Sequence, residues 1–152
     1  RLVVAGSTAP PDSFWRHAEQ LGLRERISYI ANADISALVG LYQGASVFAL
    51  PSDEEGLGVV ILEAMACGVP VVSTRSGGPD GIITDGVDGF LVPLDDADSM
   101  SLRLAQLLQT PSLNIEMGSQ ARMTIQRRYD ERVAGKVFVD MWERAIGRGA
   151  NR

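Results

Sequence analysis

An apolar segment with a single charged residue constrains this chain more than any other feature of its sequence. Residues 56–74 read GLGVVILEAMACGVPVVST, and the one charge among them is Glu63. A second acid, Glu55, stands directly before the segment and completes an E-x7-E pattern. The glycines after Glu55 are typical of a tight turn that opens a helix, which places Glu63 about two turns into that helix.

The helix expected from this segment carries Glu63 on an apolar face. Val59, Leu62 and Ala66 follow helical spacing, and Glu63 falls beside them. A carboxylate without a partner on such a face costs on the order of several kcal/mol to desolvate, so it needs either a partner or a wet cleft. We therefore expect Glu63 to face a ligand. The alternative is a structural carboxylate bonded to a backbone N–H or to an arginine.

The composition is that of one ordinary globular domain. The 152 residues are 45% hydrophobic and 22% charged, which allows a core and does not resemble a disordered chain. A net charge of −5 with scattered arginines argues against a nucleic-acid partner, because neutralising phosphates needs clustered Lys and Arg. One histidine and one cysteine, Cys67, cannot form a zinc set or an internal disulfide. We expect a buried thiol in a cytoplasmic protein, with no metal and no cofactor.

Short apolar strands alternate with helical stretches along the chain. Strands are expected at residues 2–5, 27–31, 47–50, 71–73 and 90–92, and helices at 13–21, at 35–43, around Glu63, and from Ala97 onward in segments broken near Pro111 and Tyr129. Gly77-Gly78-Pro79 is expected to be a turn. A last apolar helix face is expected to pack in a core, or to favour self-association where it is uncovered: Val137, Phe138, Met141, Trp142 and Ala145.

This alternation predicts an α/β fold with a Rossmann-like, doubly wound parallel sheet. In such sheets the ligand lies at the carboxyl ends of the strands. Those ends are Gly6-Ser7, Ala31-Asn32, residues 51–58 and residues 76–78.

The segment from Pro51 to Gly58 joins a strand to a helix. A glycine turn at a helix N-terminus presents free N–H groups, which suits a phosphate, although a tight turn without a ligand is equally compatible. It is not a P-loop, because G-x-x-x-x-G-K-[ST] is absent. Asp53 and Glu54 are expected to be solvated, His17 to lie on the surface, and the acids at 95–98 to cap a helix.

Three motifs extend this pattern. Residues 51–72 read P-S-x-x-E-G-x-G-x-x-x-L-E-A-M-A-x-G-x-P-V-V, and S-G-G-P and D-G-V-D-G-F-L-V-P follow at 76–79 and 85–93. Together they resemble the C-terminal, donor-binding domain of retaining GT-B glycosyltransferases of the group 1 (family 4) class, over nearly the whole chain. The resemblance implies a nucleotide sugar as donor substrate, retention of anomeric configuration, and no metal.

The same resemblance implies roles for individual residues. Glu55 would contact the donor sugar and is the candidate catalytic residue, and Glu63 would bind the ribose hydroxyls. Gly56, Leu57 and Gly58 would lie close to the diphosphate and sugar. Gly6 and Ser7 are weaker candidates near the diphosphate, as is Asn32 near the base.

The sequence departs from the family pattern in three respects. Asp80-Gly81 stands where the family usually carries a glutamate after the paired glycines. The family's first βα unit with its Arg/Lys pair, and its N-terminal acceptor domain, have no counterpart here. We therefore expect residues 1–152 to be a donor-binding domain truncated at its N-terminus, whose longer parent is cytoplasmic or peripheral to a membrane. A GT-B-fold nucleotide-sugar epimerase and a non-catalytic interaction module of the same fold are the alternatives.

Overall fold

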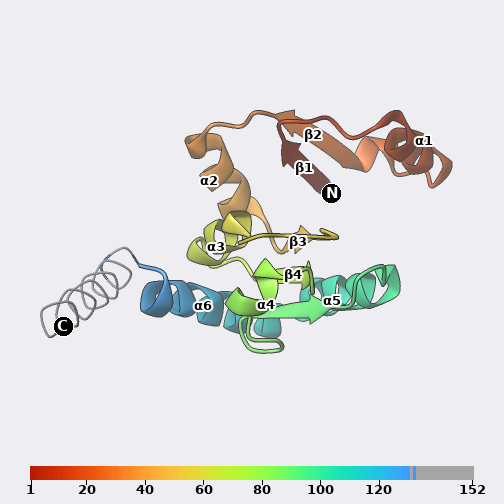
Figure 1. The fold of residues 1–152 in the computed structure, drawn as a ribbon. Coiled ribbons are helices and arrows are strands. Elements are labelled where there is room, and N and C mark those ends of the chain that lie inside the picture. The colour runs from red at the N-terminus through yellow and green to blue at the C-terminus, as the bar shows by residue number, and fades with distance from the viewer. Residues whose placement is uncertain (131, 133–152) are drawn as a thin grey trace, which may run out of the picture. The chain divides into compact units, whose positions relative to one another are not determined.

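The computed structural model describes residues 1–130 and 132, and the chain divides into two compact units, Arg1–Leu41 and Tyr42–Arg152. Figure 1 shows the elements of each unit. Within the described residues, no helix has the length and apolarity needed to cross a membrane. The apolar face expected around Trp142 lies outside these residues.

The first unit is built on a parallel pair of strands. β1 (Leu2–Gly6) and β2 (Ile27–Ala31) pair in parallel along their full length. They are connected through α1 (Asp12–Gln20) and the short 3-10 helix η1 (Arg24–Arg26). α2 (Ile35–Gly44) follows, and its residues from Tyr42 onward belong to the second unit. The start of α2 is capped by Asp34, whose carboxylate accepts a hydrogen bond of 2.8 Å from the Ala37 N–H.

β1 differs from the buried strand expected from its sequence. Leu2 and Val3 are exposed, and most of the strand is open to solvent. The physical reason is that β1 pairs with β2 alone in a two-stranded sheet, and such a pair cannot cover its own apolar side chains.

The second unit contains a three-stranded parallel sheet with the order β3-β4-β5. Its strands are β3 (Phe48–Leu50), β4 (Val71–Thr74) and β5 (Gly89–Val92). Helices join or follow these strands: α3 (Val59–Ala66), α4 (Gly78–Ile82), α5 (Ala97–Gln109) and α6 (Pro111–Arg128). The α/β class with parallel strands is thus confirmed, in two sheets that belong to the two units.

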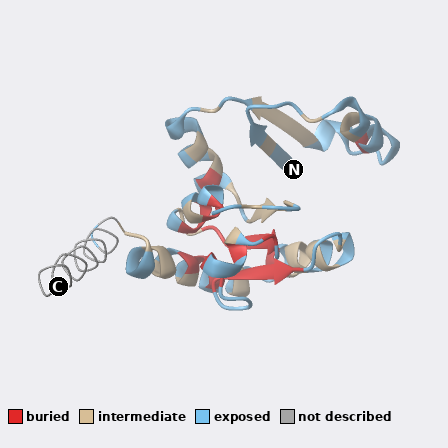
Figure 2. Cartoon of the chain, in the orientation of Figure 1, coloured by how far each residue is buried: buried red, intermediate tan, exposed pale blue. Residues whose placement is uncertain are grey.

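The core of the second unit lies around β4 and β5, whose residues are all buried (Figure 2). Val72, Phe90 and Val92 pack with Leu107 of α5 and Met117 of α6. Burial on both faces explains why the apolar residues of these strands, Val71-Val72 and Phe90-Leu91-Val92, are consecutive rather than alternating. Each such side chain contributes roughly 1.5–3 kcal/mol relative to exposure.

One expected turn is a helix. Gly77 is the N-cap residue of α4, and Gly78 and Pro79 are its first two residues. The N–H groups of the first helical turn have no intrahelical acceptor, so a proline there loses no hydrogen bond. The fixed φ of proline also suits the helical backbone. The Gly-Gly-Pro sequence is common to turns and helix starts, so the pattern alone could not separate them.

The end of α3 is fixed by two glycines. Gly68 has φ +76, and it ends the helix in a Schellman arrangement in which the Val69 N–H donates to the Ala64 carbonyl at 3.1 Å. Gly118 of α6 lies against the Gly68 backbone, where a Cβ would collide with the Gly68 carbonyl oxygen. Close approach of α3 and α6 therefore requires glycine at position 118.

Candidate active site at the start of α3

Glu55 is held by backbone contacts on two sides. Its N–H donates to the Ser76 carbonyl at 2.9 Å, and its own carbonyl accepts from the Gly78 N–H at 2.7 Å. Its Oε1 accepts from the Gly58 N–H at 3.1 Å. The Glu55 side chain thereby closes the turn that opens α3, and Oε2 of this half-buried carboxylate has no hydrogen-bond donor among the described residues.

Two glycines after β4 allow this close contact. A Cβ at Gly78 would lie 2.8 Å from the Gly56 carbonyl oxygen and 2.9 Å from that of Glu55, which no side chain tolerates. Gly77 has φ +103, and its Cβ would lie 3.3 Å from the Glu55 carbonyl oxygen. The S-G-G-P motif therefore serves as the backbone support of the Glu55 turn.

The turn leaves backbone donors free. In the part of the chain that the structure describes, the N–H groups of Gly56, Leu57, Val59 and Val60 donate to no protein acceptor. All four residues are exposed. The first N–H groups of a helix have no intrahelical acceptor, and together with the helix dipole they favour an anion. Gly58, with φ +77, supplies the left-handed conformation at which the chain enters α3.

Glu63 lies on the exposed side of α3. Ile61, Ala64 and Met65 form the buried side of the helix, whereas Val59 is 54% exposed and Ala66 is exposed as well. The apolar face expected beside Glu63 is therefore the solvent face. Of the two conditions set for this carboxylate, a partner or a wet cleft, the structure provides a partner, and the carboxylate is also exposed.

That partner is a tyrosine. The Tyr42 hydroxyl donates to Oε2 of Glu63 at 2.9 Å. Burial of the ring and the bond to the Glu63 carboxylate raise the pKa of Tyr42 well above its usual range, so the hydroxyl stays protonated as a donor. Neither a backbone N–H nor an arginine binds the Glu63 side chain among the described residues.

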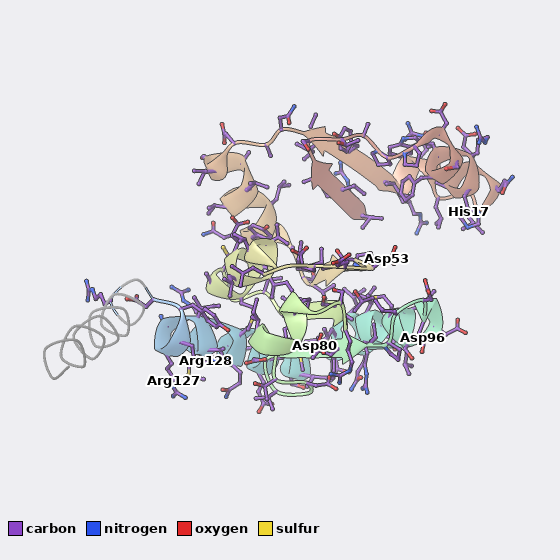
Figure 3. The ribbon with its side chains drawn as sticks, in the orientation of Figure 1. His17, Asp53, Asp80, Asp96, Arg127 and Arg128 are labelled. Carbon is purple, nitrogen blue, oxygen red and sulfur yellow. The ribbon has the colours of Figure 1, made fainter. Side chains whose placement is uncertain are left out.

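Arg75, which precedes Gly77 and Gly78 in sequence, forms a small network of ion pairs. Arg75, directly after β4, contacts Asp80 at 3.4 Å and Asp85 at 3.1 Å. Asp80, labelled in Figure 3, accepts from the Gly77 N–H at 3.1 Å. Asp80 thus caps the start of α4 from within the first turn of the helix, and Gly77 is the N-cap residue. Sequence reasoning noted Asp80 only as a departure and missed Arg75.

The candidates of the first unit form a second group. Gly6 ends β1 and Asn32 follows β2, and the Asn32 N–H donates to the Gly6 carbonyl at 3.1 Å. The Tyr29 hydroxyl donates to the same carbonyl at 2.9 Å. Asn32 has φ +47, a left-handed conformation that Asn tolerates, and Ser7 is exposed.

The remaining sequence assignments concern surface residues and the thiol. Asp53, Glu54 and His17 are exposed as expected, and Figure 3 labels His17 on α1 and Asp53 after β3. Cys67 is half-buried rather than buried, because it lies at the exposed end of α3. Among residues 1–130 and 132, no three His, Cys, Asp or Glu side chains come together in a way that could hold a metal ion.

The chemistry available at the start of α3 has two parts. Free N–H groups at the turn suit an anion such as a phosphate. The carboxylates of Glu55 and Glu63 are acceptors that suit hydroxyl groups, and each keeps one oxygen free of protein donors in the described residues. A phosphorylated polyol or a nucleotide sugar combines these features.

A family comparison agrees with this chemistry. The model of the family described as "Glycosyl transferases group 1" matches residues 1–124. The chain is 39% identical over 117 residues to a D-inositol 3-phosphate glycosyltransferase of Mycolicibacterium paratuberculosis, covering 74% of this chain and 26% of that protein. It is 35% identical over 128 residues to a GDP-mannose-dependent alpha-(1-6)-phosphatidylinositol monomannoside mannosyltransferase of Mycolicibacterium smegmatis, covering 80% of this chain and 34% of that protein. The chain thus spans only about a quarter to a third of these curated relatives.

Solved structures share the fold. Sucrose-phosphate synthase from Thermosynechococcus elongatus superposes with a TM-score of 0.84 at 24% identity, over 95% of this chain and 38% of that one. Anabaena HepE, solved in complex with UDP and glucose, superposes with a TM-score of 0.82 at 21% identity, over 93% of this chain and 40% of that one. At these identities the likeness concerns the fold.

Proposed function

This chain belongs to the group 1 glycosyl transferases, and from that premise we propose that it is the donor-binding part of a longer, cytoplasmic enzyme. The proposed reaction moves a sugar from a nucleotide sugar to an acceptor with retention of anomeric configuration. The acceptor-binding domain belongs to the same parent chain in this proposal, and no metal or cofactor is required.

The observation that carries the proposal is the condition of Glu63. Its carboxylate is exposed, it is oriented by a neutral hydroxyl, and no basic side chain neutralises it in the described residues. Exposed carboxylates that stabilise a fold do so chiefly through a cation or a backbone donor, and Glu63 has neither among the described residues. A held but unneutralised carboxylate on this exposed face suits a neutral diol, and ribose supplies one.

The turn before α3 supports a matching role for Glu55. We infer that Gly56 and Leu57 offer their N–H groups to the diphosphate, whose negative charge grows as the sugar leaves. Glu55, at the entry to the turn, would use its free oxygen for a sugar hydroxyl, while Glu63 binds ribose. For Gly6, Ser7 and Asn32 the assignments to the diphosphate and the base remain predictions.

The names of the relatives favour a transferase over the alternatives. The relatives quoted above are named glycosyltransferase and mannosyltransferase, and neither name describes an epimerase. The HepE complex contains UDP, whereas the mannosyltransferase name specifies GDP-mannose. We therefore propose a nucleoside diphosphate sugar as donor and leave the base to a binding screen.

The first experiment tests Glu63. In the full-length parent, Glu63→Ala should weaken binding of the preferred nucleotide sugar by about 1.5–3 kcal/mol, the range for a hydrogen bond to a charged group. Isothermal titration calorimetry with UDP, GDP and ADP sugars measures this loss. Glu116→Ala, at an exposed position of α6, is the matched control and should leave binding unchanged. A Glu63 variant that binds normally but melts far below wild type would make Glu63 structural and refute the proposal.

A second variant separates the two glutamates. Glu55→Gln should reduce turnover with the nucleotide sugar while leaving affinity for the free nucleoside diphosphate nearly unchanged. The amide oxygen of glutamine can still accept from the Gly58 N–H, so the turn should persist. Equal loss of nucleoside diphosphate binding in the Glu55 and Glu63 variants would contradict this division of roles.

A further inference from the structure

Tyr42 and Glu63 come from different elements and meet through one hydrogen bond. Tyr42 lies in α2 and Glu63 lies in α3, and the bond from the phenol oxygen to Oε2 is 2.9 Å long. Nothing in the E-x7-E pattern points to a tyrosine so far away in sequence.

The Tyr42 side chain is held by packing, whereas the Glu63 side chain is exposed to solvent. Tyr42 is only 8% exposed, and its ring packs edge-on against Phe48 of β3 with centroids 5.7 Å apart. Burial and this edge-on contact restrict the side-chain rotamer of Tyr42 and therefore the position of its hydroxyl. Glu63 is exposed, and a solvated glutamate on a helix otherwise samples several rotamers.

The bond orients the carboxylate without neutralising it. A phenol is one donor without charge, in contrast to an arginine, which would occupy both oxygens and cancel the charge. Oε1 of Glu63 accepts no hydrogen bond from the described residues, so it stays available. The ionised carboxylate retains acceptor capacity for two hydroxyls of a ligand.

We propose that Tyr42 is a positioning residue, whose hydroxyl holds Oε2 of Glu63 so that the carboxylate meets the vicinal hydroxyls of a ribose in a fixed geometry. This inference rests on the proposed function of Glu63. Tyr42 itself touches no ligand in it and acts through Glu63 alone. Pre-organising the carboxylate removes the entropic cost of ordering that side chain when the nucleotide binds.

The test compares a nucleoside diphosphate with its 2′,3′-dideoxy analogue in the full-length parent, using the base that the wild type prefers. Tyr42→Phe removes one oxygen and keeps the ring on Phe48. This substitution should lower the affinity for the ribonucleotide about 3- to 10-fold, as expected for ordering one side chain. It should leave the affinity for the dideoxy analogue unchanged. In a Glu63→Ala background Tyr42→Phe should have no further effect on either ligand.

A matched control removes the same chemical group elsewhere. Tyr129 donates its hydroxyl to the Gly81 carbonyl at 3.2 Å, and Tyr129→Phe should leave both affinities unchanged. Thermal melting of each variant identifies a general loss of stability. If Tyr42→Phe lowers the stability of the protein, the ratio of the two affinities still tests the positioning role, because a general structural effect lowers the affinities for both ligands alike.

The possible failures are distinguishable. The positioning role is overturned if Tyr42→Phe lowers the affinities for both ligands equally, or lowers neither. If Glu63→Ala discriminates the ribonucleotide from its dideoxy analogue while Tyr42→Phe does not, the inference fails and the function of Glu63 stands. If Glu63→Ala does not discriminate them either, the ribose assignment and the inference that rests on it both fail.

Discussion

The absence of one Cβ at Gly78 lets the loop after β4 lie against the turn that carries Glu55. Gly78→Ala would place a Cβ within 2.8–2.9 Å of backbone atoms of Glu55, Gly56 and Leu57, none of which can move as a flexible side chain would. We expect a loss of about 1–3 kcal/mol in the free energy of unfolding, the usual cost of overpacking, and displacement of the turn. Chemical denaturation and nucleotide titration measure the two effects.

A neighbouring glycine provides the control. A Cβ at Gly81, also in α4, would meet nothing within 4 Å. Gly81→Ala should therefore be neutral or slightly stabilising. Equal behaviour of the two alanine variants would show that the close approach at Gly78 does not support the turn.

At the same residue scale, the sequence reveals Glu55 and Glu63 but not what holds them. Glu55 and Glu63 lie in one segment, so their spacing is visible as a sequence pattern. The cost of desolvating a carboxylate predicts that Glu63 must be either hydrated or paired. Tyr42 reaches Glu63 from another helix, through a tertiary contact that no local period encodes. Asp80 was visible as a departure, but its capping bond to Gly77 depends on α4, which the sequence suggested to be a turn.

The packing of α3 on α6 depends on Gly118. Alanine is favoured over glycine inside a helix by up to about 1 kcal/mol, so propensity alone predicts that Gly118→Ala stabilises α6. The added Cβ would instead collide with the Gly68 carbonyl oxygen and lie 3.4 Å from Pro70. We expect the collision to dominate, with a net loss of about 1–3 kcal/mol. Urea unfolding decides the sign.

Gly40 in α2 serves as the comparison for that experiment. Its Cβ would meet nothing within 4 Å, so Gly40→Ala reports helix propensity without a collision. Stabilisation by both variants would mean that α3 and α6 can separate at no cost, contrary to the packing described.

The start of α5 should respond to acid. Asp96 accepts from the Ser99 N–H at 2.8 Å and from the Ser99 hydroxyl at 2.6 Å, and these bonds hold the pKa of Asp96 below its usual value. Because the folded pKa is depressed, the stabilisation is present above the unfolded pKa and is lost as pH falls through the folded pKa. Thermal melting of wild type and Asp96→Ala should therefore differ near neutral pH and converge in acid. A difference that is independent of pH would exclude a role for the ionised carboxylate.

The ends of helices and strands can be predicted from local sequence more reliably than their burial can. β2 was expected with its observed ends, and Asp34 and Asp96 cap the helices that their positions indicate. The apolar sequence of β1 predicts a buried strand, whereas the strand is exposed, because an apolar run reports what a strand could bury and not what covers it. The buried face of α3 was misplaced for a related reason: residues 56–72 are apolar almost throughout, so the period cannot choose a side.

At the scale of the whole molecule, the proposed function makes this chain one part of a larger enzyme. It spans 26% of the inositol phosphate glycosyltransferase and 38% of the sucrose-phosphate synthase to which it is similar. In the proposed function, the acceptor pocket, the cationic groups for the diphosphate and the opposite wall of the site belong to the parent. Excluding water from the reacting centre needs that wall.

We therefore expect the 152-residue chain by itself to be folded but unable to transfer sugar. The free N–H groups before α3 and the two glutamates should still bind a nucleoside diphosphate weakly, with a Kd of about 0.1–1 mM, equivalent to roughly 4–5.5 kcal/mol. Circular dichroism, nucleotide titration by NMR, and a transfer assay with radiolabelled UDP, GDP and ADP sugars test the three parts separately. Sustained turnover by this chain alone would place the whole site within it and refute the proposal that a parent domain completes the enzyme.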